Sequence, residues 1–405
     1  MPALLEASLR SIRALLDLPG YVIQRVERWS GWGRLTLAQK RPWFRCPKCR
    51  ATYASSQSWR ERLMRDLDIA RRHIELCVRV HRIDCTICGR VEVSISLARP
   101  YKRCTIRLEK HLFTLTKDST VKAVSRRLEI HWETVKDAEV RYIRGLLRKR
   151  NLDGITRIGI DEVSYQKRHK YLTLVTDIDG HRVIYATHGN DGASVRRFLR
   201  WFGPKRCRRI EVAVTDMHDP YTSVLKKALP KAALVYDHFH VSKVVHDALE
   251  EIRRRIQRQL PPADRRIIKG QRYVLLRARE NLSNKQRVSL QEILALNTDL
   301  TAGHILKEGF RDVFRASDRK DGRKRLKAWE EQVHESGVPE LLHVLKTIER
   351  RRKGIENFFR YRTANGMAEG FNNVVGTIKK QAYGFHDRDY LRLKILRVCG
   401  KLDDD

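Results

Sequence analysis

No run of apolar residues in the 405-residue sequence approaches the roughly 18 that a membrane-spanning helix needs. The first 20 residues are amphipathic, but charged residues from Glu6 to Asp17 interrupt them, which excludes a secretory signal peptide. The sequence also lacks internal repeats and, apart from the short acidic end Asp403–Asp405, low-complexity tracts. These absences favour a globular, cytoplasmic protein.

Acidic residues are scarce relative to basic ones. The chain has 48 Asp and Glu against 84 Lys and Arg, a formal net charge of +36, and 41% of its residues are hydrophobic. This charge far exceeds the magnitude of about 2–8 that solubility asks of a small domain. It favours a polyanionic partner, because each phosphate that Lys or Arg neutralises releases condensed counterions. Charge alone does not separate DNA from RNA, and a basic surface without such a partner is the alternative.

Cysteine occurs in closely spaced pairs rather than in a disulfide framework. Of the eight cysteines, four form two C-x-x-C pairs: Cys46, Cys49, Cys85 and Cys88. Two residues between thiolates let both sulfurs of a tight turn reach one tetrahedral ion, so we predict one structural Zn²⁺ held by all four. The alternative is two unrelated pairs of buried free cysteines. His73 and His81 are spare candidates for a ligand, although ordinary surface or core positions account for them as well.

A helix-turn-helix pattern follows the second cysteine pair. Apolar residues repeat at helical spacing over 107–117, a short helix is predicted over 120–128, and a longer helix begins at Trp132. Residues 129–131 would form the turn, and the second helix of such a unit enters the major groove of DNA. The residues placed early in that helix to meet base edges are Glu133, Thr134, Lys136 and Asp137. A plain helical linker is the alternative.

Strand and helix patterns alternate from about residue 155 to 245. The predicted strands are 155–163, 171–178, 182–187, 210–215 and 232–236, and the predicted helices are 193–202 and 221–229. Asp179-Gly180 is a tight-turn signal that makes the second and third strands a hairpin. Three antiparallel strands followed by strand–helix–strand units predict a mixed sheet flanked by helices, which is the order of a ribonuclease-H-like α/β core.

The last part of the chain is helical by pattern and rich in Arg and Lys. Pro261-Pro262 interrupts it early, and 320–330 and 349–353 are its most basic stretches. A charged helix is usually a solvated face, and a DNA-facing insertion is the alternative. The predicted domains are a zinc ribbon over 1–100, a helix-turn-helix domain over 101–150, the first part of the α/β core over 151–245, an all-α insertion over 246–360 and the C-terminal part of the core over 361–405.

Carboxylates occur on two predicted central strands. Asp161 points away from Ile158 and Ile160 on the first strand, and Asp216 follows the fourth. Hard oxygen ligands of this kind hold pairs of Mg²⁺ ions roughly 3.5–4 Å apart on a phosphodiester. A third acid, Glu369, is predicted on a helix face that it shares with Asn372, Asn373, Gly376 and Lys380. Each acid alone is more often a cap or surface group; their combined placement favours a metal site.

These segments resemble the ISL-three family of bacterial insertion-sequence transposases. The matching stretches are G159-I-D161-E, V-T-D216-M, D237-H-F-H240, N365-G-M-A-E369-G-F-N-N and I378-K-K-Q-A-Y-G384-F. The zinc ribbon and helix-turn-helix match in order, so the resemblance covers nearly the whole chain. The block around Glu369 is the most specific stretch. Gly376 departs from the lysine expected in relatives, which weakens a role of this turn in gripping phosphate.

The resemblance implies an Asp-Asp-Glu triad on a ribonuclease-H-like fold. In this chain the triad that would bind Mg²⁺ or Mn²⁺ is Asp161, Asp216 and Glu369. Asp237 and His240 would support the site or contact the DNA ends, with a structural histidine as the alternative for His240. The residues of the late helix that would follow the DNA backbone are Asn372, Asn373, Lys379 and Lys380.

The sequence therefore predicts a DNA transposase. It would bind the terminal inverted repeats of its element, cut each end with a metal-activated water and join the freed 3′-OH to target DNA. Two ends are handled together, so we expect a homodimer or a larger assembly. Two alternatives stay open: a non-catalytic zinc-ribbon and helix-turn-helix regulator, and a ribonuclease-H-like nuclease that acts on RNA.

Overall fold

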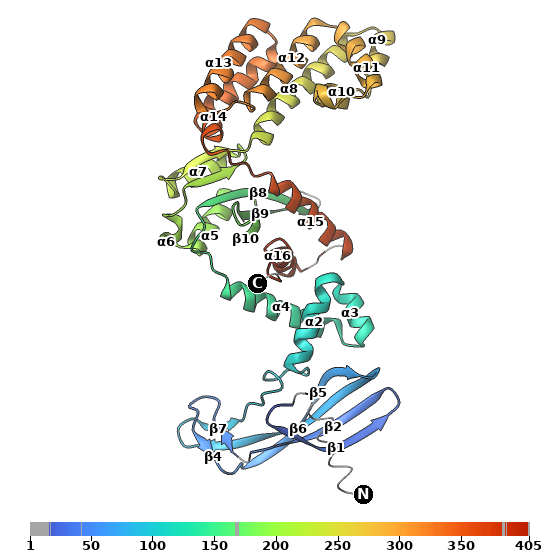
Figure 1. Cartoon of the computed structure of the whole chain (residues 1–405), viewed down its shortest axis with the longest axis vertical. Coiled ribbons are helices and arrows are strands. Elements are labelled where there is room, and N and C mark those ends of the chain that lie inside the picture. Colours follow the sequence, from blue (N-terminus) through green and yellow to red (C-terminus); the bar gives the residue numbers. More distant parts are fainter. Residues whose placement is uncertain are drawn as a thin grey trace. The chain divides into compact units, whose positions relative to one another are not determined.

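The computed structural model describes residue 16 and residues 18–41, 43–166, 170–382, 385 and 387–403. Most of the amphipathic N-terminal segment lies outside these residues, as do Tyr383 and Gly384 and the last two acidic residues. The chain forms two compact units, one up to Arg148 and one from Lys149 onward (Figure 1). None of the described helices is long and apolar enough to cross a membrane.

A five-stranded sheet makes up much of the first unit. Its strands are β1 (Tyr21–Trp29), β2 (Trp32–Gln39), β5 (Ser58–Ile69), β6 (Arg72–Cys85) and β7 (Gly89–Glu92). Their order is β1-β2-β6-β5 with β7 also paired to β6, and a separate ribbon joins β3 (Phe44–Arg45) to β4 (Thr52–Tyr53). The hairpin β5–β6 occupies the stretch between the two cysteine pairs. Alternate residues of β6, such as Leu76 and Val78, point into a buried core.

Three helices follow this sheet in the described part of the first unit: α2 (Ile106–Asp118), α3 (Val121–Leu128) and α4 (Trp132–Lys149). Thr105 and Thr120 begin the first two, because each hydroxyl accepts a hydrogen bond from a backbone N–H in the first turn. Between α3 and α4, Glu129 adopts a left-handed φ of 53°, which ends α3 and redirects the chain. The predicted helix-turn-helix is confirmed, with its turn at the predicted residues.

A second five-stranded sheet forms the centre of the second unit. Its strands are β8 (Arg157–Gln166), β9 (Lys170–Asp177), β10 (Arg182–His188), β11 (Val212–Thr215) and β12 (Ala233–Tyr236). Their order is β10-β9-β8-β11-β12; the first three pair antiparallel, and β8, β11 and β12 pair parallel. The mixed sheet predicted from the alternating pattern is confirmed strand by strand.

The hairpin predicted between β9 and β10 is confirmed, but its turn is longer than the Asp179-Gly180 pair. Asp177 pairs with Arg182, so the loop spans 178–181. The Asp177 side chain folds over this loop and accepts a hydrogen bond from the Gly180 backbone N–H at 3.0 Å. A Cβ on Gly180 would lie 2.3 Å from that carboxylate, whereas the left-handed residue is His181, with a φ of 50°. Gly180 therefore permits a close contact rather than an unusual backbone conformation.

Helices cover both faces of this sheet. One face carries α5 (Gly192–Phe202), α6 (Pro204–Cys207) and α7 (Asp219–Ala228). Ile158 and Ile160 of β8 point into the core on this face, with residues of α5 and α7. Val212 and Val214 of β11 point to the opposite face, where their core continues into a helical bundle. The alternation along β8 therefore directs Asp161 away from α5 and α7, as predicted.

The rest of the second unit is helical, as the pattern predicts. Its helices are α8 (His238–Gln259), α9 (Pro262–Ile268), α10 (Arg272–Leu276), the short 3₁₀ helix η1 (Arg279–Asn281), α11 (Asn284–Ala295), α12 (Thr298–Val313), α13 (Arg319–Ser336), α14 (Pro339–Tyr361), α15 (Met367–Gln381) and α16 (Arg388–Val398). The break between α8 and α9 falls at Pro261-Pro262, as predicted. α8 and α14 pack together, and α14 also packs on β12, which joins the bundle to the sheet (Figure 1).

A glycine inside α14 lets this helix approach the sheet closely. A Cβ on Gly354 would lie 2.4 Å from the ring of Tyr236 in β12. We expect Gly354→Ala to destabilise the second unit by about 1–3 kcal/mol, because the added methyl group forces the helix and strand apart. Denaturant unfolding of the wild type and the variant would measure this difference.

Gly376 in α15 provides the matched control. No other atom lies within 4 Å of a Cβ built at this position. Gly376→Ala is therefore expected to raise the free energy of unfolding by up to about 1 kcal/mol, since it changes only helix propensity. If both variants changed the free energy of unfolding in the same direction and by the same amount, close packing at Gly354 would not explain the effect of Gly354→Ala.

Candidate functional site

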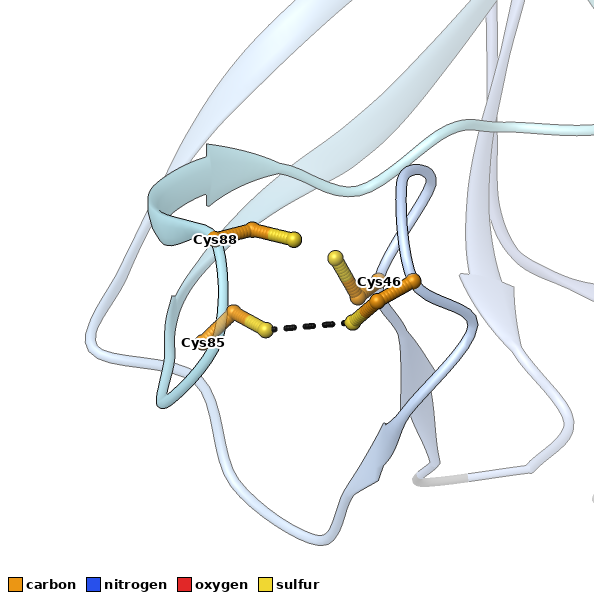
Figure 2. Close-up of side chains that lie close together, drawn as sticks. Cys46, Cys85 and Cys88 are labelled. Atoms are coloured by element: carbon orange, nitrogen blue, oxygen red, sulfur yellow. Dashed lines mark hydrogen bonds between the residues drawn. The ribbon is translucent and has the colours of Figure 1, made fainter.

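Four cysteine sulfurs converge at one end of the first sheet. Cys46 and Cys49 come from the segment between β3 and β4, and Cys85 and Cys88 from the end of β6 and the turn that follows it (Figure 2). Their sulfurs all lie within 4.8 Å of one another, and those of Cys49 and Cys85 are 3.4 Å apart. Four sulfurs at about 2.3 Å from a central ion would be about 3.8 Å apart, so this spacing fits a tetrahedral metal site.

Each cysteine pair ends in the same backbone turn. The residue after the second cysteine has a left-handed φ in both, 68° for Arg50 and 71° for Gly89. A glycine adopts this conformation without steric cost, whereas an arginine does not, so the first turn carries some local strain. The sequence signal for a metal-binding turn was thus clear at Gly89 and hidden at Arg50.

The thiols of this cluster have strongly shifted pKa values. A hydrogen bond from the Tyr53 hydroxyl, with backbone N–H groups of the turn, lowers the pKa of Cys85 to about 6. Backbone N–H groups also lower the pKa of Cys46. Burial and the neighbouring thiols raise the pKa of Cys88 to about 12. Four thiolates this close would repel one another. The positive charge of a bound cation offsets that repulsion, so metal binding releases the remaining protons.

The two spare histidines bond elsewhere. His81 Nδ1 lies 2.8 Å from the Ser56 hydroxyl, and His73 lies 3.2 Å from Asp68 and 3.3 Å from Glu129. Neither belongs to the group of metal-ligating side chains, which consists of the four cysteines. The four-cysteine set is therefore the candidate metal site of the first unit.

The first turns of α4 present the predicted DNA-reading residues in different settings. Glu133 is 67% exposed and lies 3.8 Å from His131. The Lys136 ammonium lies 5.7 Å from the centre of the Trp132 ring, which is itself exposed. Asp137 forms ion pairs with Lys102 at 3.3 Å and with Arg141 at 4.0 Å. Thr134 is half-buried.

Three aspartates directly follow the parallel-paired residues of the second sheet: Asp161 lies within β8, and Asp216 and Asp237 come after the ends of β11 and β12. Ile160 of β8, Thr215 of β11 and Tyr236 of β12 lie side by side in register. The residues that come next on these strands are Asp161, Asp216 and Asp237. Asp161 and Asp216 thus come from adjacent strands, as predicted. The carboxyl ends of parallel strands are where open α/β sheets bind their ligands.

Asp161 is buried, with 8% of its surface exposed. One carboxylate oxygen accepts a hydrogen bond from the Glu162 backbone N–H at 2.8 Å, and the other lies 3.4 Å from Nδ2 of Asn372 in α15. Burial raises the pKa of Asp161, and the negative charge of Asp216 adds to this effect. The Glu162 N–H and the positive potential of His240 oppose it. Asp161 therefore interacts electrostatically with both of these predicted partners.

Asp237 connects two segments rather than facing solvent. It is buried, and one carboxylate oxygen accepts a hydrogen bond from the Phe239 backbone N–H, which caps α8. The other oxygen accepts a hydrogen bond from the Asn365 backbone N–H at 3.1 Å. Asp237 thereby fixes the chain just before α15, the helix that carries Glu369.

Asn365 is a site residue that the sequence analysis did not single out. Its side-chain oxygen lies over Gly159 of β8, where a Cβ would come within 2.4 Å of it, and it accepts a hydrogen bond from Thr176 at 3.4 Å. The glycine and asparagine of the two matching stretches therefore contact each other. Gly159 and Asn365 each begin a stretch that matches the family, which was the only sequence signal for them, and that signal does not show that the two residues lie in contact.

α15 lies along β8. Asn372 reaches Asp161, and seven residues later the Lys379 ammonium donates to the Ser164 carbonyl at 3.1 Å. At about 1.5 Å per helical residue and 3.3 Å per strand residue, both intervals span about 10 Å, so helix and strand run side by side. Glu369 lies about one turn before Asn372 on the same side of the helix. Its side chain is exposed.

The predicted residues of α15 divide into two groups. Asn372 and Lys379 contact β8, whereas Asn373 and Lys380 are exposed. Among the described residues, the four cysteines are the one group of three or more acidic, cysteine or histidine side chains close enough to share a metal ion. The Glu369 carboxylate, one turn before Asn372, does not come within that distance of both aspartates.

Two family models match the chain. One, described as "Transposase" and belonging to the ISL3 type, matches residues 158–395, which is more than half of the chain. The other, described as "Helix-turn-helix domain of transposase family ISL3", matches residues 93–143. The first match includes all three carboxylates and the helical bundle, and the second includes α2, α3 and most of α4.

Two relatives are similar over almost their full length. The transposase for insertion sequence element IS1001 of Bordetella parapertussis is 32% identical over 385 residues, which is 93% of this chain and 94% of that protein. The transposase for insertion sequence element IS1557 of Mycobacterium tuberculosis is 27% identical over 432 residues, which is 97% of this chain and 96% of that protein. The similarity therefore extends over both units.

Proposed function

The chain belongs to the ISL3 (ISL-three) family of transposases, and we propose that Asp161, Asp216 and Glu369 are its catalytic residues on a ribonuclease-H-like core. It is a DNA transposase that binds the ends of an insertion sequence. The observation that carries the catalytic assignment is the placement of the two aspartates on adjacent parallel strands, with α15 lying along the first. Three antiparallel strands followed by parallel strands and their helices support the proposed type of core.

The residues of this site suit divalent metal ions. Asp161 and Asp216 repel each other, which a cation between them would relieve. The side-chain oxygen of Asn372 is buried beside Asp161 and has no hydrogen-bond partner among the described residues. Carboxylate and amide oxygens are the donors that Mg²⁺ and Mn²⁺ accept. When bound, such ions supply an activated hydroxyl and stabilise the leaving oxygen of the phosphodiester.

The protein's own groups position these charges. Asp237 holds the backbone before α15, and Asn372 fixes the orientation of the Asp161 carboxylate. His240 favours the ionised form of Asp161. We propose that Glu369 completes the triad when metal and DNA are present, because without them the mutual repulsion of three carboxylates keeps the site wide.

The first unit would recognise the terminal inverted repeats. We propose that the four cysteines hold Zn²⁺, since four thiolates in tetrahedral arrangement are typical of structural zinc. The start of α4 would meet base edges through Glu133, Thr134 and Lys136. In the second unit, α15 would contact the DNA backbone through Asn373 and Lys380. A homodimer or larger assembly would hold the two ends together.

Cleavage of an end-bearing duplex tests this function. Full-length protein with DNA that carries the terminal repeat of its element is expected to release 3′-OH ends when Mg²⁺ or Mn²⁺ is added, and not in EDTA. RNA–DNA hybrids are expected to compete poorly. Specific end binding without metal-dependent cleavage would favour a non-catalytic regulator, and preferential cleavage of hybrids would favour a nuclease acting on RNA.

Binding of the terminal repeat is expected to weaken steeply with salt. The net charge of +36 motivates this, because the logarithm of affinity falls by roughly 0.9 per phosphate neutralised for each unit of log salt. Between 50 and 200 mM salt, a protein that contacts about 6–10 phosphates is expected to bind about 10³–10⁵ times more weakly. Fluorescence anisotropy across a salt series would measure the slope. A nearly flat response would indicate that the basic surfaces face something other than DNA.

A further inference from the structure

A basic cavity of about 410 Å³ opens at the β12 edge of the second sheet. Its walls come from the first residues of β12, the C-terminal part of α7 and the middle of α14 (α7 and α14 in Figure 1). Leu225 and Leu229 form part of an apolar wall, and Ala233 begins the strand that closes it. Tyr236, the last residue of β12, also lines the cavity and pairs in register with Thr215, the residue before Asp216.

The lining of this cavity carries charge of one sign. It contains four basic residues and no acidic one: Lys226, Arg350, Arg351 and Lys353. Arg351 is buried and engaged, since it donates to Asp219 and to the Tyr236 hydroxyl. Lys226, Arg350 and Lys353 are exposed, and none of the three forms an ion pair with a described residue. We refer to these three residues as the basic rim.

In the described part of the chain, several arginines elsewhere in the bundle are paired with acidic side chains, whereas the three residues of the basic rim are not. On α13, Arg319 and Arg323 pair with Glu356, and Arg325 pairs with Asp321. Interaction with a helix dipole accounts for the position of only one of the three rim residues. Lys226 is in the last turn of α7, where a cation stabilises the helix C-terminus, but Arg350 and Lys353 are inside α14, one turn apart on one face. Like charges held together in this way favour an anion between them.

The lining of the cavity suits the phosphate backbone of a nucleic acid better than a base. Tyr236 is the one aromatic side chain of the lining, and it is buried, with 2% of its surface exposed. Gly354 packs so closely on the ring that a Cβ would lie 2.4 Å away, and the Arg351 guanidinium lies 5.6 Å from the ring centre. The lining therefore offers no free aromatic face on which a base could stack. Proteins that bind single-stranded nucleic acids typically provide such faces.

We propose that the basic rim binds phosphates of duplex DNA and so gives the transposase a second, sequence-independent DNA contact in its catalytic unit. Phosphate contacts of this kind hold the register of a duplex without reading its bases. The inference rests on the family membership and on the cavity. It does not depend on the assignment of the carboxylates or on the bases contacted by α4.

Binding of a duplex without terminal repeats, measured without added Mg²⁺ or Mn²⁺ and without a chelator, tests this role of the basic rim. The triple variant Lys226→Gln, Arg350→Gln, Lys353→Gln is expected to reduce the salt slope of binding by about 0.9 for each phosphate that the variant no longer neutralises. The matched control is Lys269→Gln, Lys285→Gln, Arg287→Gln, which likewise removes two lysines and one arginine, from exposed positions at the end of α9 and in α11. The control is expected to keep the wild-type slope. An unchanged slope in the rim variant, or an equal decrease in the control, would overturn the proposal.

Acylation of lysines gives a second readout that requires no substitution. Bound duplex is expected to protect Lys226 and Lys353 of the wild-type protein from an amine-reactive reagent, while Lys285 stays reactive. A mononucleotide such as deoxyadenosine monophosphate is expected to leave both rim lysines reactive at millimolar concentration. Protection by the mononucleotide alone would mean that the cavity is a nucleotide pocket, and equal reactivity with and without duplex would mean that it contacts no phosphate.

Discussion

Asp161→Asn, Asp216→Asn and Glu369→Gln should each reduce cleavage of end-bearing DNA by at least about 10³-fold while end binding persists. The proposed metal ions contribute several kcal/mol to stabilising charge in the transition state, and each 1.4 kcal/mol or so corresponds to a tenfold change in rate. Each substitution replaces an anionic oxygen by an amide at nearly constant shape, so the fold should survive. Cleavage with Mg²⁺, and binding without added Mg²⁺ or Mn²⁺ and without a chelator, would be measured on the same preparations.

Two exposed acids of the same unit serve as matched controls. Asp179 is 57% exposed in the β9–β10 loop, and Glu331 is 61% exposed on α13. Asp179→Asn and Glu331→Gln are expected to cleave at the wild-type rate. A member of the proposed triad whose amide variant still cuts DNA within a few-fold of the wild type would not be a metal ligand. For Glu369 this outcome would leave α15 as a DNA-contacting helix only.

Removal of the metal from the first unit should abolish end binding. The core around the four cysteines contains few other buried side chains, mainly Phe44, Ile83, Val91 and Val93. Such a core is too small to fold without a bound ion, and apparent binding free energies of structural zinc reach about 10–16 kcal/mol in small zinc domains at neutral pH. Chelation or Cys85→Ser is therefore expected to unfold this end of the unit and eliminate repeat binding. Metal analysis should give one zinc per chain in the wild type and none in the variant.

The second unit should keep its fold in that experiment. Its cores share no residue with the core around the cysteines. Limited proteolysis is expected to cut the first unit early and leave a resistant fragment that starts near Lys149. Cys207→Ser is the matched control, because Cys207 is half-buried in the second unit and remote in sequence from the cysteine pairs. Loss of zinc in Cys207→Ser, or full zinc content in Cys85→Ser, would disprove the four-cysteine site.

Short-range signals were sufficient for most elements of this protein. The apolar repeat over 120–128 predicted α3, and Pro261-Pro262 predicted the break after α8. The hairpin β9–β10 followed from two strand patterns with a turn signal between them, although the four-residue loop did not. Caps, turns and amphipathic periodicity depend on residues a few positions apart, so a single sequence contains the information. Each C-x-x-C spacing is likewise a short-range signal, and the two together predicted the cysteine cluster.

The contacts that build the candidate catalytic site join residues far apart in the chain. Asn372 and Asp161 are separated by 211 positions, and Asn365 and Asp237 by 128. The resemblance to a family suggested which acids belong together, but it did not show that Asp237 is a cap that anchors α15. Arg350 belongs to the basic stretch 349–353, but nothing in the sequence links it to Lys226; the two line one cavity because α7 and α14 both reach the same sheet edge. Which faces meet depends on how the whole sheet and bundle pack, and short-range patterns contain no record of that packing.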